Sequence, residues 1–370
     1  MSRFSRLACS ATALLVVSAC DVAVTAPPLS PGGPDPDVFG SPGLTVMTQN
    51  LYVGADFSGL LSGADPSTVL AEILAALQHT NFGARASALA MEIVTSQAQL
   101  VGLQEVSRFE LPAGLGFPTE LDYLTILMAY IQAYGGDYVV AAQQPELQLT
   151  IPIVLNGIPV GTGTYQDRDV ILARSDVQVE DALGGWYSTQ QIVSVGGASF
   201  PFLRGWAAVT ATAAGQTIRF VTTHLEVQQF RPVPEEQARE LAALFADDPH
   251  PVVMVGDFNS AANPHAADEE RSDSYHILRN AGYEDLWLRE PHSVGGPTCC
   301  NAVLLDNLEP DMHSRLDLVL ARYGPAGFGG RSDTYLVGEE PDDRIDLAPG
   351  YTLWPSDHAG VVATLWPAPG

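Results

Sequence analysis

The sequence predicts an α/β (α+β) protein in which two β-sheets pack face to face and are covered by helices. Short apolar runs rich in β-forming residues recur between residues 44 and 365. Helical stretches with apolar residues on one face lie between some of these runs. The pair Asn156-Gly157 separates two apolar runs, which is a strong hairpin signal. With 370 residues and 46% hydrophobic content, the chain can bury a sizeable core.

The expected elements follow in chain order. Apolar or alternating runs that stop at turn residues or polar residues predict strands at 44–49, 100–103, 138–142, 147–155, 170–173, 191–195, 206–211, 218–223, 252–255, 316–321, 334–337 and 359–365. Periodic apolar residues predict helices at 84–96, 119–134, 235–245 and 273–281, the third with Pro234 near its first turn. Gly196-Gly197 and Ala214-Gly215 are expected turns. No internal repeat is visible.

The first residues predict export. Two arginines, at positions 3 and 6, precede an apolar stretch at 7–17 that is too short to span a bilayer stably. Small residues then lead to Cys20, which resembles the bacterial lipoprotein signal, in which cleavage leaves the cysteine as a lipid-modified N-terminus. Residues 1–19 are therefore expected to be a lipoprotein signal peptide. An ordinary secretory signal cut nearby is the alternative.

The residues after Cys20 predict a tether. Residues 20–42 are rich in Pro, Gly, Ser and Asp and lack periodicity, which leaves 43–370 as the folded domain. The expected location is the cell envelope, where lipidated Cys20 would anchor the protein to a bacterial membrane, facing the periplasm or the exterior. No obligate protein partner is expected.

The charge limits the classes of partner. The formal net charge is −26 at pH 7, and removal of residues 1–19 with their two arginines makes it two units more negative. The sequence contains no lysine. Such acidity disfavours a broad grip on nucleic acid and adhesion to anionic lipid head groups. It is compatible with phosphate chemistry, because a bound divalent cation inverts the local field.

The cysteines do not predict a disulfide framework. Cys9 lies in the expected signal peptide and Cys20 is assigned to lipid, which leaves the neighbours Cys299 and Cys300. Two thiols, a disulfide between neighbours and pairing with an external partner all remain open for this pair. A metal site built from the pair alone is not expected, because no second cysteine pair completes it.

The most informative motif is Gly256-Asp257-Phe258-Asn259, which ends an apolar run. Asp257 and Asn259 lie two positions apart and emerge on the same side of an extended chain. At the end of a buried strand they can face a cleft, where an acid activates water and an amide holds an oxyanion. A simple turn is the alternative interpretation, since Asp and Asn favour turns.

Other apolar runs also end or begin at polar groups. These groups are Asn50, Gln104-Glu105, His224, Asp317 and Asp357-His358. Each one alone has an ordinary structural explanation, such as a cap, a solvated carboxylate or a structural histidine. Together they predict a site where strand ends converge.

The ordered set Gln49-Asn50, Gln104-Glu105, Thr223-His224, Gly256-Asp257-Phe258-Asn259, Arg315-Leu316-Asp317 and Ser356-Asp357-His358 resembles the endonuclease/exonuclease/phosphatase superfamily. The resemblance runs from about residue 44 to residue 365. It implies a four-layer sandwich of two mostly antiparallel sheets flanked by helices. It also implies hydrolysis of phosphoester bonds with a divalent metal, Mg²⁺ or Mn²⁺, with Ca²⁺ as a further candidate.

The resemblance also implies roles for the polar residues. Glu105 is the expected principal metal ligand, with Asn50 and Asp357 beside it, in keeping with the preference of Mg²⁺ for oxygen ligands. Asp257 is expected to orient or deprotonate the attacking water, and Asn259 to donate to a phosphate oxygen or to the nucleophile. The remaining expected groups are the histidines, as phosphate contacts or proton donors, and the aspartate that orients one of them: His224, His358 and Asp317.

Arg168 departs from the family pattern, because Asp167-Arg168-Asp169 stands where many relatives have a small residue. A guanidinium there can clamp a phosphate, and the alternative is a solvated turn with an internal ion pair.

The expected substrate is a phosphoester of a nucleic acid, a phospholipid or a small phosphate metabolite, which the sequence does not distinguish. The rival interpretation is a non-catalytic surface lipoprotein that keeps the fold as a binding module. A metal-independent hydrolase has no Gly-x-Ser-x-Gly motif to support it.

Overall fold

The computed structural model describes residues 43–366, apart from 62–65, 156, 196–197, 264–266, 268–269, 290–294 and 324–330. The predicted signal peptide, the tether and Cys20 lie outside the described residues, as do the expected turn residues Asn156, Gly196 and Gly197.

The larger sheet has eight strands, and its central pair, β1 and β2, is parallel. In spatial order its strands are β15 (Ser332–Val337), β18 (Gly360–Leu365), β1 (Leu44–Asn50), β2 (Leu100–Gln104), β6 (Ile158–Arg174), β3 (Arg108–Glu110) and β4 (Glu120–Asp122), with β5 (Tyr138–Leu155) also paired to β6. The remaining pairings are antiparallel. Near its tip, the long β5–β6 hairpin pairs only with itself and so extends beyond the rest of the sheet.

The second sheet has six strands. They run in the order β13 (Glu284–Asp285), β14 (Asp317–Arg322), β12 (Val252–Asp257), β11 (Gln216–His224), β10 (Gly205–Ala213) and β7 (Gln178–Trp186). Here β11 and β12 form the parallel pair. Two separate hairpins are β8 (Gln191–Val195) with β9 (Ala198–Phe202), and β16 (Ile345–Ala348) with β17 (Tyr351–Leu353).

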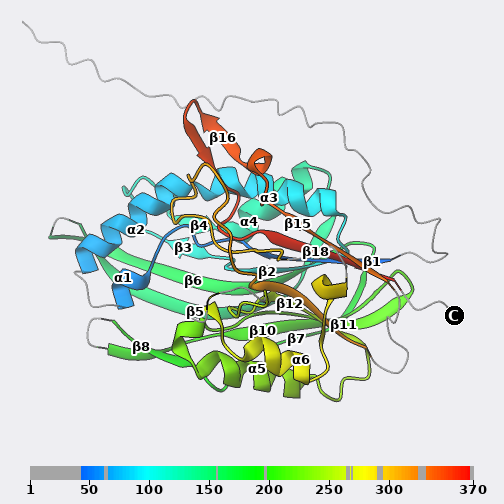
Figure 1. The fold of residues 1–370 in the computed structure, drawn as a ribbon. Helices are drawn as coiled ribbons and strands as arrows, with labels where there is room; N and C mark the ends of the chain where they lie inside the picture. Colours follow the sequence, from blue (N-terminus) through cyan, green and yellow to red (C-terminus); the bar gives the residue numbers. More distant parts are fainter. Residues whose placement is uncertain are drawn as a thin grey trace, which may run out of the picture. The chain divides into compact units, whose positions relative to one another are not determined.

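Helices cover the outer faces of both sheets, which gives four layers (Figure 1). The helices are α1 (Ser58–Leu61), α2 (Pro66–Thr80), α3 (Phe82–Ser96), α4 (Tyr123–Ala133), α5 (Val233–Leu244) and α6 (Ser274–Asn280), and short 3-10 turns lie at Gln228–Phe230, Leu286–Arg289 and Pro341–Asp343. One core lies between α2, α3, α4 and the larger sheet, a second between the sheets, and a third between α5, α6 and the second sheet. The predicted four-layer, mostly antiparallel sandwich is thereby confirmed.

The two sheets approach closely below the ends of their central strands. A Cβ added to Gly102 would lie 2.4 Å from a methyl carbon of Val255 and 2.6 Å from Oγ1 of Thr222, so the contact requires glycine. Gln104 Nε2 donates to the same Thr222 hydroxyl at 2.8 Å. A buried polar link therefore ties β2 to β11 at the level where the polar strand ends begin.

The structure extends several expected elements and adds others. Residues 138–155 form one strand with irregular pairing near Pro145 rather than two strands, and β6 begins at Ile158 rather than at residue 170. The second expected helix starts at Tyr123, because Asp122 caps it by accepting from the backbone N–H of Leu124. Elements with no matching sequence prediction are α1, α2, β3, β4, β7, β9, β13, β16 and β17.

Among the described residues, no helix combines the length and the apolar composition that crossing a membrane requires.

Candidate active site

The register of the strands brings the polar ends together. His224 lies opposite Asp257 in the parallel β11–β12 pair, and Asp257 lies opposite Asp317 in the antiparallel β12–β14 pair. In the other sheet Asn50 lies opposite Gln104, directly before Glu105. Because both parallel pairs end at the same mouth of the sandwich, the side chains predicted from scattered motifs meet there.

Asn50 connects the two sheets. Its Nδ2 donates to Oε1 of Glu105 at 3.1 Å and to Oδ2 of Asp257 at 3.3 Å, while its Oδ1 accepts from the backbone N–H of Tyr52 at 2.9 Å. Oε2 of Glu105 accepts from the backbone N–H of Val53 at 2.7 Å. Asn50 therefore holds the two carboxylates in place with its nitrogen, and its oxygen is engaged by the backbone.

Three residues at this mouth have left-handed backbones, although none is glycine. The φ angles are 58° at Tyr52, 55° at Glu105 and 46° at Asn259. Such conformations cost about 1–3 kcal/mol each and persist where neighbouring contacts hold them in place. Here the Asp257 carboxylate accepts from the Asn259 N–H at 2.9 Å, and buried Arg85 donates to the Tyr52 carbonyl at 3.0 Å. The loops that present the functional groups are thus tightly braced.

His358 is oriented by Asp317. Its Nδ1 lies 2.7 Å from Oδ2 of the fully buried Asp317, and its Nε2 lies 3.9 Å from Oδ2 of Asp257. Burial alone would lower the pKa of His358, but the neighbouring carboxylates, Asp317 foremost, outweigh it and raise that pKa well above its usual range. His358 is therefore cationic at neutral pH in the metal-free protein.

The other carboxylates of the mouth, Asp357 and Asp257, are buried, and His358 offsets only part of the cost of ionising them. Burial raises the pKa of Asp357 to about 7, helped by the charge of Glu105 and opposed by His358. Burial also raises the pKa of Asp257 to about 6, again opposed by His358. Crowded buried carboxylates of this kind create a strongly negative potential. A divalent cation would relieve it.

His224 contacts a second group of buried charges. Its Nδ1 lies 2.9 Å from Nη1 of Arg204, whose Nη1 is also 3.3 Å from Glu146 and 3.8 Å from Asp167. A guanidinium can only donate, so Nδ1 of His224 must accept, and the ring proton is on Nε2. Burial, then Arg204, lowers the pKa of His224 well below its usual value. His224 therefore presents a neutral N–H, with Nε2 3.4 Å from Oδ2 of Asp257.

Asn259 lies within the same network. Its Nδ2 donates to the carbonyl of Leu225 at 2.9 Å and lies 3.0 Å from Nε2 of His224; with the ring proton on Nε2, both of these nitrogens are donors and can face a shared acceptor. The left-handed backbone described above turns this side chain back toward β11. The residue before the turn is Gly256, with φ of 148°. It has to be glycine, because a Cβ at this position would lie 2.0 Å from the Thr223 carbonyl oxygen.

The structure does not bring Arg168 to this mouth. Its Nη2 lies 2.5 Å from Oδ1 of Asp122, and its Nε donates to the Val106 carbonyl at 3.0 Å. The ion pair of the alternative interpretation is present, but with Asp122 as the partner, and Arg168 is buried within β6 rather than in a solvated turn. An arginine that does reach the site is Arg204, which directly precedes β10. The sequence gives no signal that an arginine before a strand would face His224. Nor does it indicate that Glu146 of β5 and Asp167 of β6 would lie beside that arginine.

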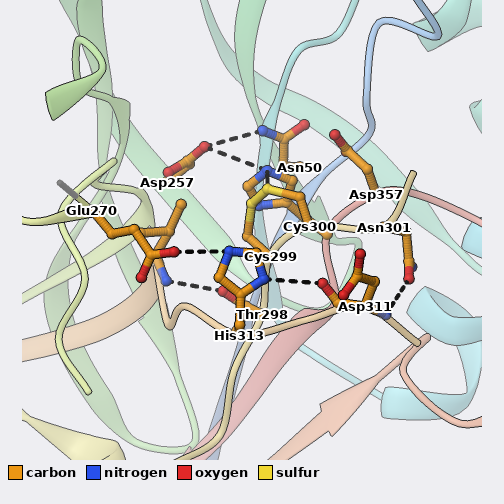
Figure 2. The surroundings of a disulfide bond; sticks show 12 residues. Asn50, Asp257, Glu270, Thr298, Cys299, Cys300, Asn301, Asp311, His313 and Asp357 are labelled. Atoms are coloured by element: carbon orange, nitrogen blue, oxygen red, sulfur yellow. Dashed lines mark hydrogen bonds and ion pairs between the residues drawn. A yellow bond between two sulfur atoms is a disulfide. The ribbon is translucent and has the colours of Figure 1, made fainter. Parts of the chain in front are cut away.

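The adjacent cysteines border the site. The structure joins Cys299 and Cys300 in a disulfide, and Figure 2 shows this pair together with Asn50, Asp257 and Asp357. Sγ of Cys300 lies 3.9 Å from Nε2 of His358. The pair is held by backbone hydrogen bonds between Cys299 and Ser314, three residues before Asp317.

The donor set fits a hard divalent cation. Glu105 and Asp357 offer carboxylate oxygens and line one cavity, and Asp257 lies beside them through Asn50. Mg²⁺ and Mn²⁺ take such oxygen ligands, and Mg²⁺ keeps several waters, so few protein ligands suffice. A second group, Glu146, Asp167 and His224, already has Arg204 in its midst and needs no metal.

A family model described as Endonuclease/Exonuclease/phosphatase matches residues 47–358 of the chain. No curated protein compared with the chain gives a significant sequence match.

Solved structures share the fold. TDP2 from D. rerio, complexed with a single strand DNA product, is 18% identical, with 88% of this chain and 99% of that chain covered and a TM-score of 0.52. Truncated TDP2 from Caenorhabditis elegans is 17% identical, with 89% and 99% covered and a TM-score of 0.50. A family protein from Leptotrichia buccalis is 13% identical, with 87% and 99% covered and a TM-score of 0.52.

Proposed function

Because the chain belongs to the endonuclease/exonuclease/phosphatase family of phosphoester hydrolases, we propose that it is a metal-dependent phosphoesterase that works by in-line attack of water. The observation that carries this proposal is the junction between the two sheets, where Asn50 bonds to both Glu105 and Asp257. Structural carboxylates have no reason to crowd at a cavity mouth without a cation to share them.

The chain's own groups divide the work. Glu105 and Asp357 would hold the cation, with Asn50 orienting Glu105. When bound, the cation withdraws charge from the phosphoryl oxygens. Asp257 would position the attacking water and take its proton, and the pKa of about 6 lets it act as a base near neutral pH.

The phosphoryl group would be held by donors. His224 offers the N–H of Nε2, Asn259 an amide, and His358 a cationic imidazole that Asp317 keeps charged and oriented. Water oxygen bonds to phosphorus while the ester oxygen departs with its electron pair and is protonated from one of these donors or from solvent. Positioning and electrostatics supply most of the acceleration in such a reaction.

The test is metal-dependent hydrolysis of bis(p-nitrophenyl) phosphate by the purified protein. We expect nitrophenol release with Mg²⁺ or Mn²⁺ and its loss after chelation with EDTA. A protein that leaves this ester, a short-chain phospholipid and DNA all intact with either metal present would instead be the non-catalytic binding module.

We also propose that the enzyme is exported and lipid-anchored through Cys20. The proposal rests on the basic start, the short apolar stretch and the tether-like composition of residues 20–42. Cys20→Ser is expected to move the protein from the membrane fraction to the soluble fraction of the bacterial cell envelope and to abolish labelling with a radioactive fatty acid. Unchanged membrane retention without any lipid label on the native protein would contradict the anchor.

A further inference from the structure

An apolar cavity of about 700 Å³ opens directly beside the catalytic carboxylates. Glu105, Asp357 and His224 lie along its wall. Much of the remaining wall is apolar and comes from the loop after β1, from β5 and from the β8–β9 hairpin: Phe57, Leu149, Ile151, Val193, Phe200 and Phe202. The reacting phosphate would therefore sit at the boundary between a charged mouth and an apolar chamber.

The chamber adjoins another cavity along β5. A second, small cavity of about 40 Å³ shares Phe57, Leu149, Ile151 and Tyr165 with the first. Its lining also includes Ile153 of β5 and side chains of α2 such as Leu74. From Leu147, in the first cavity, to Ile153, in the second, β5 spans roughly 20 Å. Along this length of β5 the side chains of Leu149, Ile151 and Ile153 give the two adjoining cavities an apolar lining, which suits a hydrocarbon chain.

The charges along this path argue against a polynucleotide. Among the described residues that line the larger cavity, Arg204 carries the one permanent positive charge. Arg204 is committed to His224 and to the buried carboxylates Glu146 and Asp167. A nucleic acid needs cations along successive phosphates. One phosphate at the metal, followed by hydrocarbon, matches both the charge and the lining.

We propose that the substrate is a phosphoester that carries a long hydrocarbon chain, and that this chain lies in the channel along β5. The proposal rests on the proposed function for the position of the phosphate. The reaction itself is unchanged: water adds to phosphorus and the ester oxygen leaves as an alcohol. The channel adds binding energy through the apolar surface that it removes from water.

Two p-nitrophenyl phosphodiesters that differ only in their second alkyl group, methyl or octyl, test this directly below the micellar concentration of the octyl ester. Each methylene that leaves water fully adds up to about fourfold. Allowing for incomplete burial, we expect kcat/KM to be at least ~10-fold higher for the octyl ester. Equal values for the two esters would overturn the proposal and leave the phosphoesterase function intact.

A matched pair of variants locates the chain. Ile151→Asp puts a carboxylate into the wall that both cavities share, so the octyl-to-methyl ratio of kcat/KM should fall about tenfold. Ile158→Asp makes the same change on the same hairpin, where the side chain is 65% exposed and lines neither cavity, and should leave the ratio unchanged. Because each ratio is measured on one preparation, partial unfolding cancels. A ratio that both variants lower equally would overturn the location.

Calorimetric measurement of octylphosphonate and methylphosphonate binding, with Mg²⁺ present, tests the channel independently of the phosphoesterase function. Tighter binding of the octyl compound by a protein that hydrolyses neither ester would support the channel and refute the phosphoesterase function. Equal binding of the two compounds would refute the channel whatever the activity.

Discussion

Glu105→Ala is expected to lower the rate of phosphoester hydrolysis by at least ~10²-fold, the size of effect that follows loss of a principal electrostatic group. Glu105 offers two carboxylate oxygens at the cavity, each already oriented by a single donor, from Asn50 and from Val53. Alanine keeps the backbone but removes both oxygens. Asp357 alone would then hold the cation, with weaker affinity and a displaced position.

A second measurement separates loss of the metal from loss of the fold. Mg²⁺ should raise the melting temperature of the native protein, because a ligand that binds only the folded state stabilises it. This rise should disappear in Glu105→Ala. Glu110→Ala is the matched control, since Glu110 lies five residues on, is exposed and shares Arg108 with Glu120. A rate within threefold of the native rate in Glu105→Ala would show that the metal is held elsewhere.

The fold class followed from local patterns because its central strands are buried on both faces. Runs such as Val252 to Val255 have to be apolar, and their abrupt polar ends mark the edge of the sandwich. The edge elements were missed for the opposite reason. β7 is largely exposed and β3 has three residues, so neither needs a recognisable apolar pattern. Their places are decided by pairing with β10 and β6, which is long-range information.

The site residues that lie at strand ends could be predicted from the sequence. Those that reach the site only through tertiary packing could not. Asp257 and Asp317 meet because the register of β12 and β14 pairs them. Arg204 and Glu146 meet His224 only through packing of β5 against β10. The left-handed backbone at Glu105 likewise depends on contacts that close in the finished fold. Residue type alone indicates neither this packing nor this backbone conformation.

Asp317→Asn is expected to lower kcat by about 10²-fold or more, because it removes the charge that keeps His358 cationic and oriented. Asp317 is fully buried, and its Oδ2 lies 2.7 Å from Nδ1 of His358. Asparagine preserves the volume and can still accept that hydrogen bond. The lost quantity is therefore the negative charge and, with it, the largest of the carboxylate contributions that raise the pKa of His358.

The stability of the metal-free protein gives this substitution a pH signature. The folded pKa of His358 is raised above its unfolded value, so its contribution is fully present below about pH 6.5 and is lost as the pH rises through the folded pKa. Asp257 acts in the same direction, because burial, with the charge of Asp317 added to it, raises its pKa to about 6, and loss of the Asp317 charge makes its ionised form less unfavourable. The decrease in melting temperature caused by Asp317→Asn should therefore be largest near pH 6 and progressively smaller in alkaline buffer.

The signature distinguishes the role of Asp317 in charging His358 from a simple packing role. A packing defect would lower the melting temperature by a similar amount at every pH, since volume does not titrate. Asp346→Asn, on the exposed side of β16, is the matched control and should alter neither kcat nor the pH dependence. A pH-independent loss of stability in Asp317→Asn, with kcat reduced less than tenfold, would show that His358 does not act as a cation in the reaction. The phosphate would then depend on His224 and Asn259 alone for its donors.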